Sequence, residues 1–64
     1  MNEIIVRELI RELLYHNVDE TTIRSVIIGL DTEKQYNQMI DWLREVKCPT
    51  KNDIMLKVYL LTEE

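Results

Sequence analysis

Apolar residues recur at three- and four-residue spacing in four segments of the chain, and short polar turns separate these segments. This spacing is the period of one face of an α-helix. The pattern therefore predicts four short helices, near residues 3–15, 20–29, 32–47 and 50–61.

A helix-capping residue precedes each apolar segment, which supports the helical interpretation. Ser, Thr, Asp and Asn side chains satisfy the free N–H groups of a first helical turn, and four such residues stand at the expected starts: Asn2, Asp19, Thr32 and Thr50. Gln35 stands three residues after Thr32, the spacing of a capping box. Gly29 and the pair Cys48-Pro49 are predicted to end the second and third helices.

The second half of the chain repeats the apolar pattern of the first. Leu9, Ile10 and Leu13 recur thirty residues later as Met39, Ile40 and Leu43. Each half has the order helix, turn, helix, and a hairpin of this size cannot bury its apolar face alone. We therefore expect an all-α fold in which two tandem helical hairpins stack as a single domain, residues 1–64.

An α+β fold is the alternative. Residues 21–28 are rich in β-branched side chains, and residues 54–61 would suit a buried strand. The capping residues directly before both segments favour helices.

The predicted helices differ in how their apolar residues are distributed. In the first, Leu14 joins Leu9, Ile10 and Leu13 on one face. In the second, Ile28 points away from the common face. In the fourth, Lys57 is the only polar residue between positions 54 and 61, so this helix is apolar almost all round. Such a helix is either central in a core or shared between chains.

The apolar side chains are nearly all bulky, because the chain contains eight Ile, eight Leu and five Val but neither Ala nor Phe. Close helix–helix approach through small residues is therefore not expected. A chain of 64 residues buries a smaller fraction of its surface than a larger domain does. This excess of aliphatic bulk predicts self-association, with a homodimer as its simplest form.

Charge and cysteine content indicate the environment of the chain. The net charge of −4 disfavours binding to phosphate backbones and anionic membranes. No apolar run reaches the length of a membrane span. The single cysteine, without a signal peptide, predicts a reducing, cytoplasmic location.

The sequence offers no recognisable site for catalysis, a metal or a cofactor. His16 and Cys48 supply two potential zinc ligands at most, whereas a structural zinc site needs four. The same two residues form the only Cys–His pair, and no glycine-rich loop accompanies them. Nucleotide- and calcium-binding motifs are absent. We expect a protein that is not an enzyme and has no cofactor.

A basic stretch provides the alternative function. Residues 44–57 have the form of the first two helices of a helix-turn-helix, and the possible nucleic-acid contacts are Arg44, Lys47, Lys51 and Lys57. However, the second of these helices offers mainly aliphatic side chains, and a recognition helix needs polar and basic ones. A nucleic-acid-associated adaptor is therefore the second hypothesis.

The leading hypothesis is a small, non-catalytic protein-interaction or regulatory module that self-associates through an apolar helical face. Large aromatic side chains at the margin of a core often anchor interfaces, and Trp42 lies off the main stripe of its helix. Covering the edge of its own core is the other interpretation of Trp42. The predicted interaction residues are Trp42, Met55, Leu56, Tyr59 and Leu60.

Overall fold

The computed structural model describes residues 2–63; Met1 and Glu64, the ends of the predicted domain, lie outside the described residues. It consists of four α-helices: α1 (Glu3–Tyr15), α2 (Glu20–Gly29), α3 (Glu33–Glu45) and α4 (Lys51–Thr62). Residues 2–63 contain no strand, so the all-α prediction is confirmed and the α+β alternative, with strands near 21–28 and 54–61, is wrong.

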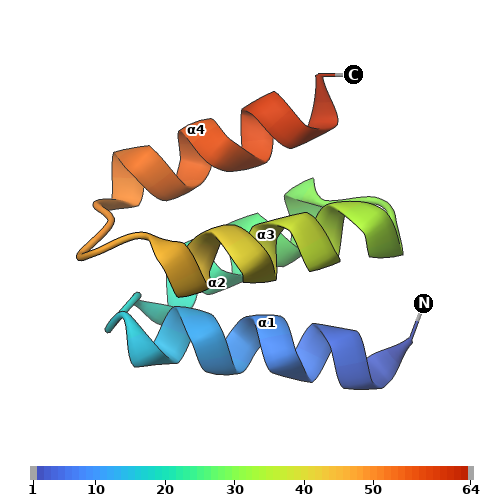
Figure 1. Ribbon diagram of the computed structural model, residues 1–64, viewed down its shortest axis with the longest axis horizontal. Helices are drawn as coiled ribbons and strands as arrows, with labels where there is room; N and C mark the ends of the chain where they lie inside the picture. The colour runs from blue at the N-terminus through green and yellow to red at the C-terminus, as the bar shows by residue number, and fades with distance from the viewer. Residues whose placement is uncertain (1, 64) are drawn as a thin grey trace.

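The four helices run in alternating directions, and corresponding helices of the two hairpins pack together (Figure 1). α1 packs most extensively against α3, and α2 packs against α4. The turns from α1 to α2 and from α3 to α4 lie at one end of the molecule, whereas the link from α2 to α3 lies at the other (Figure 1). Stacking of one hairpin on the other therefore builds the shared core.

The predicted capping residues begin all four helices. The side chains of Asn2, Asp19, Thr32 and Thr50 each accept a hydrogen bond from a backbone N–H in the first turn. Both α3 and α4 begin with a complete capping box, in which Asp53 takes the role that Glu or Gln usually has. These local interactions fix where each helix starts.

The core is formed by the inward stripes of all four helices. Its buried apolar residues are Leu9, Leu13, Ile23, Val26, Leu30, Tyr36, Met39, Ile40, Leu43, Ile54 and Val58. The prediction that Ile28 points outward is confirmed, since its side chain is exposed. The prediction for Leu14 is wrong: this side chain is also exposed, because the first helix buries the stripe through Leu9 and Leu13 instead.

The third helix ends earlier than the sequence pattern predicts. α3 stops at Glu45, and Val46 already has an extended conformation with ψ 152°. Cys48 has a positive φ of 47°, as Asn17 has in the corresponding turn at 60°. A proline restricts only the residue directly before it, so Pro49 cannot by itself explain where α3 stops.

Gly29 ends α2, as predicted, but it does so without the left-handed conformation that glycine often has at a helix end. Its φ is not positive, and the helix ends because Leu30 is extended, with ψ 135°. A Cβ atom added at Gly29 would lie 2.9 Å from the Cγ1 atom of Val58. The glycine therefore allows α2 and α4 to approach closely, which corrects the expectation that small residues play no part in helix packing.

Candidate functional site

Three large apolar side chains project outward from α4. Ile54 and Val58 anchor this helix in the core, and Met55 and Leu61 are half-buried against it. Leu56, Tyr59 and Leu60 keep 56%, 57% and 53% of their surface exposed. We call these three residues the α4 face. Their spacing places them next to one another on successive turns of the helix.

A groove of about 500 Å³ lies along one side of the α4 face, between α3 and α4. From α3 and the turn that follows, it is lined by Trp42, Val46, Lys47 and Pro49. From α4 it is lined by Asp53, Leu56, Lys57 and Leu60. We call this feature the α3–α4 groove; apolar side chains form most of its wall, and the charged side chains are two lysines and one aspartate.

The structure brings together three of the five residues predicted for protein interaction. Trp42, Leu56 and Leu60 line the α3–α4 groove. Tyr59 is exposed on the α4 face but does not line the groove. Met55 is half-buried and packs against the core, so it contributes less to the outer surface than the pattern suggested.

Trp42 has one of the two roles that the sequence left open. It is half-buried and packs against the core cluster, so it covers the edge of the protein's own core. Its remaining surface forms part of the groove wall. Val46, Pro49 and Asp53 were not among the predicted interaction residues. Val46 and Pro49 join the site because the turn after α3 runs beside α4, and Asp53 joins it from the first turn of α4. The sequence pattern carried no signal for the path of that turn.

The charged side chains of the groove differ in the contacts that they make within the chain. The Oδ2 atom of Asp53 accepts a hydrogen bond from the Thr50 backbone N–H at 3.0 Å. Hydrogen bonding to the carboxyl from the backbone N–H of Thr50, and secondarily from the Thr50 side chain, lowers the pKa of Asp53 from its ordinary value of 3.8, so the carboxylate stays ionised near neutral pH. Within residues 2–63, Lys47 and Lys57 form no ion pair.

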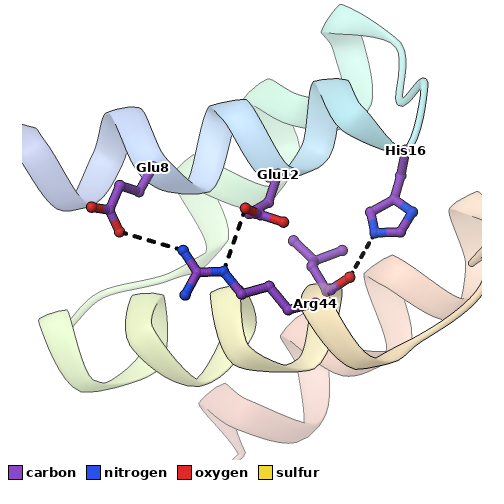
Figure 2. Close-up of polar contacts among 5 residues, drawn as sticks. Glu8, Glu12, His16 and Arg44 are labelled. Atoms are coloured by element: carbon purple, nitrogen blue, oxygen red, sulfur yellow. Dashed lines mark hydrogen bonds and ion pairs between the residues drawn. The ribbon is translucent and has the colours of Figure 1, made fainter.

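The four residues predicted for nucleic-acid contact have different surroundings in the structure. Arg44 reaches across to α1, where its guanidinium lies 3.4 Å from Glu12 and 3.9 Å from Glu8 (Figure 2). Lys51 borders a small hollow near Asp19, and its charge helps to lower the pKa of that carboxyl. Lys47 and Lys57 both line the α3–α4 groove.

His16 has a structural contact that the sequence did not reveal. Its Nε2 atom lies 2.6 Å from the carbonyl oxygen of Leu43, to which it donates, and the ring points from the end of α1 toward α3 (Figure 2). The Leu43 carbonyl belongs to the last turn of α3, where no N–H of the same helix is available. The imidazole therefore ties the ends of two helices together.

The two residues of the potential Cys–His pair lie at the same end of the molecule, and the imidazole contacts a different group. Cys48 is exposed and borders the same hollow as His16, at the end of the molecule that carries both turns. However, the His16 Nε2 atom is engaged by Leu43, and the carboxylate of Asp19 accepts both of its hydrogen bonds from Thr22. No carboxylate among residues 2–63 is bonded to the imidazole, as a catalytic triad would require.

Comparison of the chain with protein-family models, with curated proteins and with solved structures gives no match. Among residues 2–63, no three or more His, Cys, Asp and Glu side chains are grouped so that they could hold a metal ion. None of the described helices combines the length and the apolar character needed to cross a membrane.

Proposed function

We propose that this chain is a small, non-catalytic protein-interaction module that self-associates through the α4 face. The observation that carries the proposal is the exposure of Leu56, Tyr59 and Leu60, each more than half accessible on adjacent turns of one helix. Burying a fully exposed side chain of this kind contributes about 1.5–3 kcal/mol, and each of these three, already about half buried, can contribute roughly half of that. The three residues on each of two chains therefore favour association.

The neighbouring groove supports the same proposal. Interfaces are commonly centred on a large aromatic or aliphatic side chain that fills a pocket on the partner. The α3–α4 groove offers such a pocket directly beside the α4 face, with Trp42 in its wall. The exposed side chains and the pocket that could receive them thus lie on the same side of the molecule.

The first experiment is the solution mass of the chain, measured by light scattering over a roughly hundredfold range of concentration with reductant present, because association obeys mass action. The expected result is a mass that rises to that of two chains. A variant with Leu56→Gln and Leu60→Gln is expected to keep the mass of one chain. If the wild-type chain keeps the mass of one chain throughout, self-association is wrong.

Leu14→Gln provides a matched control. Leu14 has 57% of its surface exposed, nearly the same as Leu56, but it lies on α1. This variant is expected to associate like the wild-type chain. If it lost association to the same extent as the double variant, the α4 face would not be the contact surface. Helical content, followed by circular dichroism, shows that all variants remain folded.

A further inference from the structure

The α4 face and the α3–α4 groove together determine how a partner would dock. The groove residues of α4 are Asp53, Leu56, Lys57 and Leu60. At about 100° per residue, these four positions fall within an arc of about 100° on the helix. A single helix laid along the groove would therefore touch all four.

A helix is the shape of partner that this surface accepts. The described residues contain no sheet edge to which an extended strand could add. A helix satisfies its own backbone hydrogen bonds and needs only an apolar face with anchors at i, i+3 or i+4, and i+7. The α4 face has this spacing itself, with Leu56 and Leu60 one turn apart.

The charged residues of the groove are complementary to those of a second copy of the groove that runs in the opposite direction. Asp53 and Lys57 lie one turn apart on the same side of α4. In an antiparallel helix pair with its two-fold axis beside position 55, residues equidistant from the axis face one another. Asp53 of each chain then faces Lys57 of the other. The arrangement therefore pairs opposite charges at two symmetry-related places.

We propose that the partner in this groove is a second copy of the chain, whose α4 packs antiparallel on the first with Leu56 beside the two-fold axis and Lys57 against Asp53. At a rise of 1.5 Å per residue, the two Leu56 side chains lie within about 3 Å of each other along the axis. Each Leu60 then reaches the end of the partner's groove, where Val46 and Pro49 form the wall. This inference rests on the proposed self-association and specifies its geometry.

The experiment uses opposite charges at position 56. Leu56→Glu and Leu56→Lys each place two like charges beside the axis, which opposes association. Each variant alone is expected to have a dimer Kd raised by at least about a hundredfold, since like charges in an interface cost several kcal/mol. An equimolar mixture is expected to recover the mass of two chains, because a Glu side chain then faces a Lys side chain.

The corresponding pair at Leu14, with Leu14→Glu and Leu14→Lys, is the matched control. Each of these variants is expected to dimerise alone, and mixing them is expected to change nothing. If the Leu56 variants stayed at the mass of one chain when mixed, while the wild-type chain formed a dimer, the antiparallel arrangement would be wrong and self-association would stand. If the wild-type chain were a monomer, both proposals would fail.

A second pair of variants tests the charge contact. Lys57→Glu places a carboxylate against the partner's Asp53 and is expected to raise the dimer Kd by about tenfold or more, as repulsion across an interface does. Lys34→Glu makes the same change in net charge at an exposed position near the start of α3 and serves as the control. Equal effects of the two variants would show that Lys57 does not face Asp53, which overturns the proposed register.

Discussion

Gly29 of α2 faces Val58 of α4 so closely that a Cβ atom at position 29 would lie 2.9 Å from the Val58 Cγ1 atom. Val58 is buried and β-branched, so its side chain has little freedom to move aside. The single glycine of the chain thus sets the distance between the second helices of the two hairpins.

Gly29→Ala is expected to destabilise the fold even though alanine favours helices. Overpacking of a core costs about 1–3 kcal/mol, whereas the gain in helix propensity is at most about 1 kcal/mol and smaller at a helix end. A net loss of about 1 kcal/mol would lower the Tm by about 4–8 °C in a domain of this size. Thermal unfolding at fixed protein concentration measures this change in Tm.

The cause can be isolated by a double-mutant cycle with Val58→Ala. Removing the Val58 methyl groups opens the space that the new Cβ atom needs, so Gly29→Ala is expected to be harmless or stabilising in that background. An equal loss in both backgrounds would mean that the contact between positions 29 and 58 is not responsible.

The hydroxyl of Tyr36 donates a hydrogen bond of 3.0 Å to the carbonyl oxygen of Ile27, and Tyr36 is buried. This carbonyl lies in the last turn of α2, where the helix itself provides no donor. Burial, helped by the charge of Asp31, raises the pKa of Tyr36, so the hydroxyl remains a donor up to strongly alkaline pH. Tyr36→Phe is expected to cost about 1 kcal/mol, the typical net value of such a bond.

Urea unfolding measures this loss, and Tyr15→Phe is the matched control because the Tyr15 side chain is exposed. The control is expected to leave the free energy of unfolding unchanged. A loss of equal size in both variants would contradict a specific role for the bond between α3 and α2.

Protonation of Asp19 at acid pH is expected to lower the stability of the fold. Its carboxylate accepts hydrogen bonds from the Thr22 hydroxyl at 2.6 Å and from the Thr22 N–H at 3.1 Å. These bonds, the hydroxyl bond first, hold the pKa of Asp19 below its ordinary value of 3.8. Because the pKa is lower in the folded state, the contribution to stability is complete above the unfolded pKa and is lost as the pH falls through the folded pKa.

Asp19→Asn is expected to reduce this loss, because asparagine still caps the helix but does not titrate in this range. The urea midpoint, measured between about pH 5 and about pH 2, should fall less steeply than in the wild-type chain, and the remaining fall reflects the other carboxylates. Asp41→Asn, at an exposed position of α3, is the control. An identical acid slope in the wild-type chain and Asp19→Asn would contradict the assignment.

The starts of the helices could be predicted from the sequence because they depend on local chemistry. A cap needs one side-chain oxygen close to the first turn, and Thr32 with Gln35 or Thr50 with Asp53 satisfies that need within three residues. The core stripes of α2 and α3 were also predictable, since helical periodicity alone determines which residues share a face.

Features that depend on contacts between distant segments could not be predicted. The close approach at Gly29 requires knowing that α2 packs on α4. The bond from His16 to Leu43 requires knowing that two turns lie at the same end of the molecule. For the same reason, the sequence identified Trp42, Leu56 and Leu60 as candidates for interaction but did not identify Val46 and Pro49 as their neighbours in the groove.

Trp42 provides an optical test of where a partner docks. It is the only tryptophan of the chain, it is half-buried, and it forms part of the wall of the α3–α4 groove. If the α4 helix of a second copy occupies this groove, the indole loses contact with water as the chains associate. Its emission maximum is therefore expected to move to shorter wavelength as the protein concentration rises, in step with the increase in mass.

The Leu56→Glu variant is the control for this measurement, because its emission should not change over the same concentrations. Adding an equimolar amount of Leu56→Lys should restore the shift, since the mixed pair again places an apolar helix over Trp42. A wild-type chain that doubled its mass without any change in emission would place the contact surface away from the groove. In that case the exposed side chains of α4 would pair on the Tyr59 side of the helix, which does not line the groove.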